Sequence, residues 1–187
     1  MKRIILHWTG GTGLANTSDR AHYHILIEQD GKVIAGTRNP ESNLDTSDGD
    51  YAAHTRALNT GSIGVALCAM SGAREHPFSA GYHAITDAQV DALAVAVADL
   101  CATYGIPVTP RTVLTHAEVP VTLGVAQQGK WDVTFLPGMH APDDPLVVGD
   151  TIRSMIQREL IKVSPPVAQG PVTLIKRILQ WLQSLMR

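Results

Sequence analysis

The chain has 187 residues, 44% of them hydrophobic, and a formal net charge of −2; this size and composition fit one globular domain with a substantial core. Residues 153–187 hold six basic residues and one acid, so an acidic body precedes a basic tail. A nucleic-acid binder would carry its basic face on the fold itself, so this pattern argues against that class and suggests that the tail meets something anionic.

The first predicted elements are strands. Residues 3–8 (RIILHW) predict a buried strand that ends on a histidine and runs into a glycine-rich turn. Two further strand signals, at residues 23–28 and 32–35, flank the Asp30-Gly31 pair, which is a strong hairpin signal. We therefore expect an N-terminal strand followed by a β-hairpin.

Residues 37–61 are rich in Asn, Asp, Ser and Thr and predict a long surface loop. The apolar run at residues 62–70 has the length of a strand and predicts a central one. Over residues 86–104 the apolar positions recur at helical spacing, and Thr86 and Gln89 are placed to form a capping box.

Residues 112–115 predict a short strand that delivers His116. A loop over residues 120–140 follows, and then a helix that Asp150 caps and that runs through residue 161. This order of strands, helix, strand and helix favours an α/β fold, a single domain with a central mixed β-sheet flanked by helices. We assign residues 1–162 to that domain.

The C-terminal part has a different composition. Residues 163–171 (VSPPVAQGP) predict a linker. Residues 172–187 place Leu, Ile and Met at helical spacing with Lys and Arg largely off that stripe, and they predict a basic amphipathic helix. Such a helix either docks its apolar face on the domain or seeks an anionic membrane or lipopolysaccharide surface.

The sequence predicts neither a signal peptide nor a membrane-spanning segment. Lys2 and Arg3 are followed by only three apolar residues before His7, too short a core for a signal peptide, and no run approaches a membrane span. We expect a chain made in the cytoplasm that must be released if its substrate lies outside. Cys68 and Cys101 lie in apolar runs and predict buried free thiols.

Four residues stand out for chemistry. His7 and His116 each end an apolar strand signal, and Asp132 lies in the GKWDVTFLPG segment with Lys130 two residues before it. Two neutral imidazoles and one carboxylate would leave the fourth position of a tetrahedral zinc site free for water, as catalytic zinc sites do. Spacing alone leaves other arrangements open, because the chain has eight histidines and nothing short-range links His7 to the other two.

Five segments, in order, resemble the zinc amidase family that includes N-acetylmuramoyl-L-alanine amidases, phage endolysins and peptidoglycan recognition proteins. The segments cover roughly residues 1–160, and the likeness is strongest to phage and prophage endolysins, in which a THAE segment precedes KWD and LPG. They are IILHWTGG (4–11), YHILIEQDGKV (23–33), AAHTRALNTGSIGVAL (52–67), LTHAEV (114–119) and GKWDVTFLPG (129–138).

The resemblance implies a role for each residue of the site. It places the zinc ligands at His7, His116 and Asp132, the catalytic lysine at Lys130 and the catalytic tyrosine at Tyr23. It implies an enzyme that cleaves the amide bond between N-acetylmuramic acid and L-alanine in the bacterial cell wall, reached in the periplasm after release. Zinc would activate the attacking water and Lys130 would stabilise the oxyanion.

Other positions are less settled by the resemblance. Some members carry a glutamate where this chain has Ala66, which favours the version with tyrosine and lysine. His54 and Asn59 match the edge of the substrate groove, and we expect them either to contact substrate or to brace the loop. Glu118 is a lesser candidate for the proton donor to the leaving amine.

Two other functions stay open beside the endolysin-like hydrolase. One is a peptidoglycan-binding module without activity on the same fold, against which the complete set of zinc-site residues argues. The other is a cytoplasmic amidase that recycles muropeptides, which the lack of a signal peptide permits but the basic tail disfavours.

Overall fold

A five-stranded mixed sheet forms the centre of the molecule, in the strand order β3-β2-β4-β1-β5. The computed structural model describes residues 1–163. The central strand β4 pairs in parallel with both β1 and β2, β5 pairs in parallel with β1, and β3 closes the other edge in the antiparallel sense. The strands are β1 Arg3–Trp8, β2 Ile25–Ile27, β3 Val33–Ala35, β4 Ser62–Leu67 and β5 Val113–Thr115.

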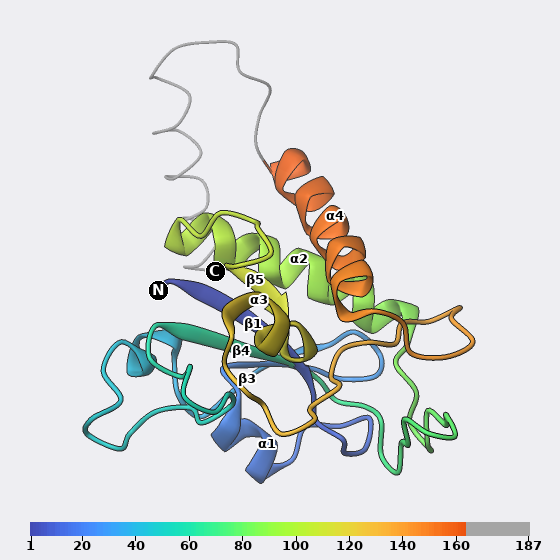
Figure 1. Cartoon of the computed structure of the whole chain (residues 1–187). Coiled ribbons are helices and arrows are strands. Elements are labelled where there is room, and N and C mark those ends of the chain that lie inside the picture. The colour runs from blue at the N-terminus through green and yellow to red at the C-terminus, as the bar shows by residue number, and fades with distance from the viewer. Residues whose placement is uncertain (164–187) are drawn as a thin grey trace, which may run out of the picture.

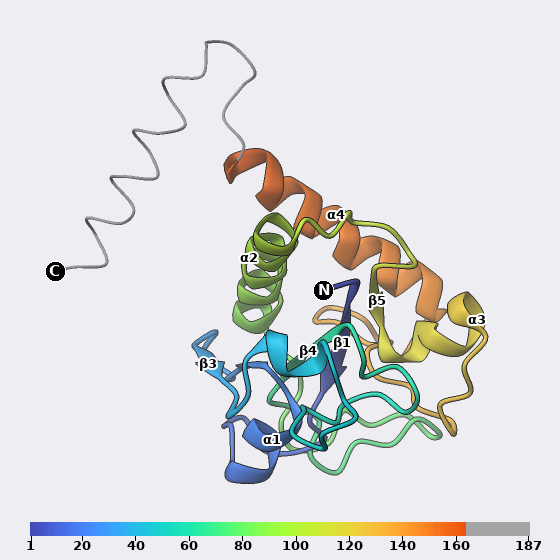
Figure 2. The ribbon, with the colours of Figure 1, turned by 90° about the vertical axis from the view of Figure 1, so that its left-hand side faces the viewer.

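Helices cover the two faces of this sheet unequally. The two long helices α2 and α4 pack on each other over one face, and the short helix α1 lies on the opposite side of the sheet (Figures 1 and 2). The helices are α1 Thr17–His22, α2 Asp87–Tyr104, α3 Val119–Leu123 and α4 Pro145–Val163, with short 3₁₀ turns η1 Pro40–Asn43 and η2 His116–Glu118. The predicted single α/β domain with a flanked central sheet is confirmed.

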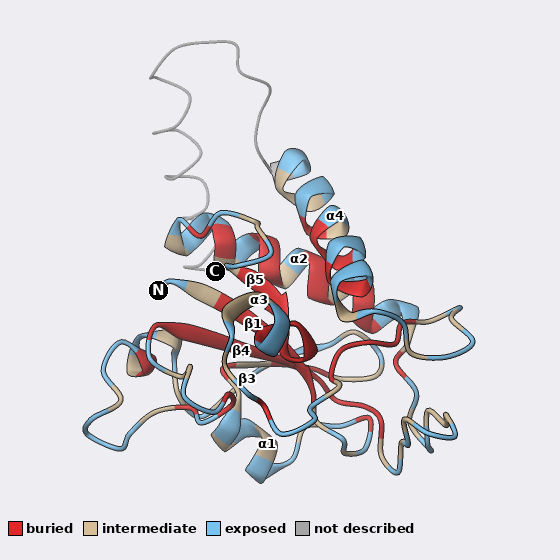
Figure 3. Ribbon diagram, in the orientation of Figure 1, coloured by how far each residue is buried: buried red, intermediate tan, exposed pale blue. Residues whose placement is uncertain are grey.

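The alternation of side chains along β1 divides the interior into two parts. Ile4, Leu6 and Trp8 belong to the main core, which fills the space between the sheet and the long helices α2 and α4 (Figure 3). Successive side chains of a strand point to opposite faces. Ile5 therefore joins a second, smaller cluster on the other face, and His7 follows it two residues later on that face.

Helix α2 begins as its sequence predicts. The Thr86 hydroxyl accepts from the Gln89 backbone N–H, and the Gln89 side chain accepts from the Thr86 backbone N–H, which completes the capping box. The buried Gln89 amide also donates to the carbonyls of Ile27 and Cys68. The Gln89 side chain thus caps the start of α2 and also bonds the helix to the sheet.

The predicted start of the last helix is wrong. Helix α4 begins at Pro145, five residues before Asp150, because the Asp144 carboxylate accepts from the Leu146 backbone N–H and Pro145 occupies the first helical position. Asp150 lies inside the helix and pairs with Arg153. The helix extends to Val163, one residue into the predicted linker.

Three other sequence expectations need correction or have no outcome here. Strand β4 ends at Leu67, three residues before the predicted end. The predicted loop at 37–61 holds η1, and α3 overlaps the start of the predicted loop at 120–140. Helix α1 lies between the first predicted strand and the hairpin, where periodicity predicts no helix. The hairpin is confirmed, and Cys68 and Cys101 are free and buried.

The predicted amphipathic helix at 172–187 lies outside the described residues. Within residues 1–163 no helix combines the length and the apolar character needed to cross a membrane.

A buried ion pair joins α4 to the strand edge where His116 lies. Arg153 donates two bonds to the fully buried Glu118 carboxylate, at 3.1 and 2.8 Å, and a third to the Val113 carbonyl at 2.9 Å. The Thr115 backbone N–H donates to the same carboxylate at 2.7 Å. Gly149 leaves room for this pair, since a Cβ there would stand within 2.3 Å of the carboxylate oxygens.

We expect Arg153→Met to destabilise the domain by about 3–5 kcal/mol, because it leaves the Glu118 carboxylate buried and unpaired. Urea unfolding followed by far-UV circular dichroism measures the change. The control is Arg158→Met on the exposed side of the same helix, which should stay within about 0.5 kcal/mol of the wild type. Equal effects of the two substitutions would contradict a role for the pair.

Candidate metal centre

Parallel strand pairing brings the first two site residues together. Leu6 of β1 pairs with Thr115 of β5, so the next residue on each strand, His7 and His116, stands at the same edge of the sheet. His7 is the fifth residue of β1, and His116 opens the 3₁₀ turn η2 directly after β5. Residues 109 positions apart in the sequence thus become neighbours.

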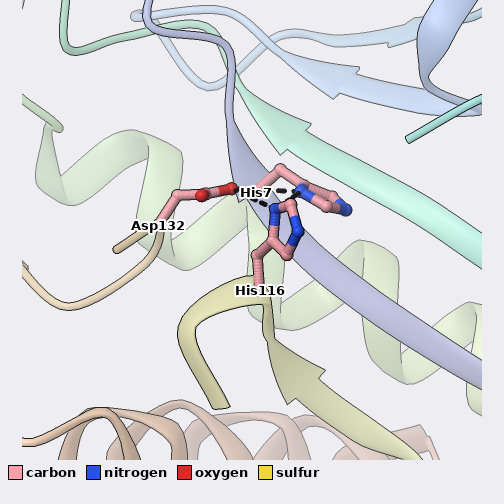
Figure 4. A group of neighbouring side chains, drawn as sticks. All are labelled: His7, His116 and Asp132. Carbon is pink, nitrogen blue, oxygen red and sulfur yellow. Dashed lines mark hydrogen bonds and ion pairs between the residues drawn. The ribbon is translucent and has the colours of Figure 1, made fainter. Parts of the chain in front are cut away.

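The loop that carries Asp132 is attached to the same edge by two contacts. The Asp132 backbone carbonyl accepts from the Ala117 N–H at 2.6 Å. The Trp131 ring packs edge-on against Trp8, with ring centroids 4.6 Å apart. These contacts turn the Asp132 carboxylate toward the two histidines, as Figure 4 shows.

Three atoms converge at the centre of the site (Figure 4). His7 Nδ1, His116 Nδ1 and Asp132 Oδ2 lie 3.1 Å from one another in all three pairs. All three side chains are nearly or fully buried. Among residues 1–163, these three side chains form the group whose ligand atoms lie close enough together to hold one metal ion.

The charge states suit a cation at this position. Burial lowers the pKa of His7 to about 4, so its imidazole is neutral at pH 7. Burial alone would raise the pKa of Asp132, but the polar contacts of its carboxyl with the His116 and His7 rings outweigh burial and hold that pKa well below its usual range. A neutral imidazole and an ionised carboxylate are the forms that bind metal.

The spacing fits a zinc ion. Ligand atoms bound at about 2.0–2.1 Å in a tetrahedron lie about 3.3 Å from one another, close to the 3.1 Å found between the three atoms here. A site of two nitrogens and one oxygen is also a donor set that zinc accepts, with one position left for a non-protein ligand. His7, His116 and Asp132 can therefore hold a metal, as the sequence predicts.

Tyr23 and Lys130 both lie near His7. The Tyr23 ring lies 5.2 Å from the His7 ring, centroid to centroid. Burial and the Asp132 charge raise the pKa of Tyr23, so its hydroxyl stays protonated and able to donate. Lys130 is exposed, and its positive charge is near enough to lower the pKa of His7.

The structure places His54 behind His7 and not at the surface. His54 Nδ1 lies 3.2 Å from His7 Nε2 and 2.8 Å from the Thr55 hydroxyl. Its ring packs over Gly64, where a Cβ would come within 2.5 Å of it. The Asn59 side chain accepts from the backbone N–H groups of His54 and Thr55. Of the two roles expected for His54 and Asn59, these contacts describe the brace of the loop.

Two other expectations concern Ala66 and Glu118. Ala66 pairs with His7 across the parallel strands and is fully buried, which puts the position of the alternative glutamate directly beside the first ligand. Glu118 is fully buried, and both its oxygens bind Arg153 of α4. Because substrate cannot reach it, Glu118 is wrong as a candidate proton donor; it holds the turn that carries His116.

Sequence reasoning missed Gln127. Its side-chain oxygen lies 2.9 Å from His116 Nε2, and its amide nitrogen reaches the Arg56 carbonyl at 3.0 Å. The residue lies in the predicted loop over residues 120–140, and no sequence pattern distinguishes it there.

The chain matches a known protein family over most of its length. Residues 1–138 match the family model described as N-acetylmuramoyl-L-alanine amidase. The matched range includes both histidines, Lys130 and Asp132. No curated protein sequence matches the chain significantly.

Several solved structures match this chain at low sequence identity. AmiD from E. coli, in complex with the substrate anhydro-N-acetylmuramic acid-L-Ala-D-gamma-Glu-L-Lys, is 22% identical with a TM-score of 0.50, over 72% of this chain and 52% of that chain. The amidase LysC from Clostridium intestinale is 16% identical with a TM-score of 0.49, over 83% and 85% of the two chains. The Ph2119 endolysin of a Thermus scotoductus bacteriophage is 22% identical with a TM-score of 0.42, over 62% and 71%.

The buried histidines predict acid sensitivity of the metal-free protein. The folded chain lowers the pKa of His7 from 6.5 to about 4, so below pH 6.5 the unfolded chain binds more protons than the folded one. The stability that is complete above about pH 6.5 should therefore decline as the pH falls toward 4. Urea midpoints in the presence of a chelator measure this decline.

Two variants test the assignment of that decline. His7→Gln should show a shallower loss between pH 6.5 and 4, whereas His140→Gln replaces an exposed histidine and should follow the wild type. Parallel curves for all three proteins would refute the role of the buried imidazole.

Proposed function

Because this chain belongs to the N-acetylmuramoyl-L-alanine amidase family, we propose that His7, His116 and Asp132 hold the zinc ion with which it hydrolyses its substrate. The reaction is the cleavage of the amide bond between N-acetylmuramic acid and L-alanine in peptidoglycan, which makes the chain a cell-wall hydrolase. The observation that carries the proposal is the 3.1 Å triangle of buried donor atoms. When bound, zinc lowers the pKa of a coordinated water toward about 7 and polarises a carbonyl.

Lys130 supplies positive charge at the mouth of the site. The amide carbonyl of the substrate becomes an oxyanion on attack, and a fixed cation or hydrogen-bond donor at that oxygen stabilises the transition state. Lys130 is exposed and yet close enough to influence His7, so its ammonium can reach a substrate bound over the three ligands. We assign it this role.

Tyr23 is the second donor. Its phenol stays protonated because it is largely buried beside the Asp132 charge, and its ring lies against His7. A neutral hydroxyl in that position can donate a hydrogen bond to the attacking water or to the developing oxyanion. His54 and Asn59 act on the same groove from behind, by holding the loop that borders it.

A cleft beside Lys130 gives the substrate a place to lie. It has a volume of about 300 Å³, and Trp131 and Asp143 also line it. Trp131 contributes an apolar ring to the lining of this cleft, and Asp143 contributes an acidic group. We assign this cleft to the part of the peptidoglycan strand next to the scissile amide.

The ligand set and Lys130 can be separated by experiment. His116→Ala should lose zinc, below one ion per chain in elemental analysis, and lose amine release from purified peptidoglycan. Lys130→Ala should keep its zinc and lose about 10²–10³-fold in kcat, the usual cost of removing one oxyanion donor. Full activity of either variant would remove the proposal.

Matched controls come from exposed residues of the same types. His140→Ala and Lys32→Ala replace an exposed histidine and an exposed lysine, and both should retain wild-type zinc content and activity. Loss in these controls would point to a general effect of the substitutions and not to the site.

We further propose that residues 172–187, which lie outside the described residues, bind an anionic membrane or lipopolysaccharide surface. The support is the sequence: residues 164–187 hold three basic residues and no acid, among apolar residues at helical spacing. Binding to the inner or outer membrane would hold the enzyme at the periplasmic cell wall after its release from the cytoplasm.

Deleting residues 165–187 should leave activity on purified peptidoglycan intact and weaken binding to phosphatidylglycerol vesicles. The triple change of Lys176, Arg177 and Arg187 to Gln should weaken it too, most clearly at low salt. As a control, Gln at the exposed positions Lys32, Arg74 and Arg158 should bind vesicles as the wild type does. A deletion that unfolds the domain would instead identify a docked helix.

A further inference from the structure

In each of the two metal-site histidines, the Nε2 atom, which is not the atom facing the other two ligands, contacts another side chain. His116 Nε2 meets the Gln127 side-chain oxygen at 2.9 Å, and His7 Nε2 meets His54 Nδ1 at 3.2 Å. A ligand histidine binds metal through one ring nitrogen only when the proton sits on the other. The groups behind the rings therefore decide which nitrogen is free for the metal.

The amide of Gln127 has one possible orientation. Its nitrogen lies 3.0 Å from the Arg56 carbonyl and 3.3 Å from the Val125 carbonyl, and a carbonyl only accepts. If the amide were turned over, its oxygen would face these two carbonyls and its NH₂ group would face His116. The Gln127 oxygen must therefore point at His116 Nε2.

The orientation of the amide sets the tautomer of His116. An amide oxygen accepts and does not donate, so the 2.9 Å contact requires a proton on His116 Nε2. In the neutral ring, Nδ1 then carries the lone pair, and Nδ1 is the atom that points at His7 and Asp132. Gln127 thus aims a free electron pair at the position of the metal.

Burial makes this contact strong and costly to lose. Gln127 is only 3% exposed, so neither its oxygen nor His116 Nε2 can exchange the bond for one to water. A buried polar group left without its partner costs about 1–3 kcal/mol. The ring of His116 is therefore held in one rotation.

The same loop supports both histidines. Arg56, whose carbonyl fixes the Gln127 amide, is two residues from His54, which contacts His7. His54 Nε2 in turn lies 3.4 Å from the Ser62 carbonyl, which favours a proton there and leaves His54 Nδ1 to accept from His7. Residues 54–56 thus contact the supports of both ligands, His7 in β1 and His116 in the turn after β5.

We propose that Gln127 is a positioning residue that, fixed by the Arg56 carbonyl, holds His116 in the tautomer and rotation that bind zinc through Nδ1. This inference rests on the proposed metal site and adds to it a residue outside the ligand set. Partners of this kind, placed behind a ligand, commonly change metal affinity by about 10–100-fold.

The test measures zinc affinity of the full chain by competition with a chromophoric chelator. Gln127→Met keeps the length of the side chain and removes the acceptor, and it should weaken zinc binding about 10–100-fold. Gln127→Glu keeps an oxygen acceptor at the same reach, and with a proton on its second oxygen it can still donate to the Arg56 carbonyl, so it should lose less zinc affinity than Gln127→Met. The visible spectrum of the Co²⁺-loaded protein should accordingly change more in Gln127→Met than in Gln127→Glu.

Gln89→Met is the matched control. Gln89 is also a buried glutamine, 0% exposed, whose amide donates to two backbone carbonyls, but it lies at the start of α2. Its loss should lower the urea midpoint of the metal-free protein while zinc affinity and the Co²⁺ spectrum stay unchanged. An equal loss of affinity in Gln89→Met and Gln127→Met would reduce Gln127 to a structural role and overturn the inference.

Failure of this inference and failure of the proposed function are distinguishable. A wild-type chain that binds no zinc would defeat the metal site itself. A wild type that binds zinc, together with a Gln127→Met variant that binds it equally tightly, would defeat only the role of Gln127. An equal weakening by Gln127→Met and Gln127→Glu would show that the acceptor is not what matters, and would also overturn it.

Discussion

The parallel pairing of β1 with β5 is the constraint on which the site depends. Parallel strands end at the same edge of a sheet, so one register, Leu6 beside Thr115, sets the separation of His7 and His116. A slip by one residue would turn His7 to the face that α2 and α4 cover. The apolar residues Ile4 and Leu6 oppose that slip, because it would move both out of the main core. The hydrophobic core thus maintains the geometry of the metal site.

The site concentrates three electron-rich atoms in a buried space, which is an unfavourable arrangement unless a cation joins it. Two neutral imidazole nitrogens and a carboxylate oxygen at 3.1 Å repel one another when both histidines carry their protons on the far nitrogens. Contacts outside the site hold these three atoms close together. The Glu118–Arg153 ion pair fixes the turn that carries His116, and the Ala117 N–H donates to the Asp132 carbonyl in the loop that carries the carboxylate. A bound cation would turn this repulsion into attraction and would stabilise the folded chain, since the unfolded chain has no such site.

Sequence patterns predict the elements whose signals lie within a few neighbouring residues, and they fail where contacts between distant residues decide the structure. The strand at residues 3–8 and the Thr86 capping box are local patterns, and both are found in the structure. The start of α4 was predicted wrongly because Asp144 and Asp150 are both acceptable caps, and only the packing of Arg153 on Glu118 places Asp150 inside the helix. Strand ends alone made His7 and His116 one choice among several. The resemblance, and then the sheet register, singled them out, while Gln127 had no pattern of its own.

The loop between His116 and Lys130 has two tasks that depend on each other. Near the end of the loop, the Gln127 amide reaches the Arg56 carbonyl, and three residues later Lys130 and then Trp131 line the cleft. The Lys130 backbone N–H bonds the Gln127 carbonyl at 3.3 Å, so the two residues close one turn. A change in the length of this turn would move Lys130 and the Gln127 contact with His116 together. With the roles proposed for these two residues, one short segment of backbone would affect both substrate binding and metal binding.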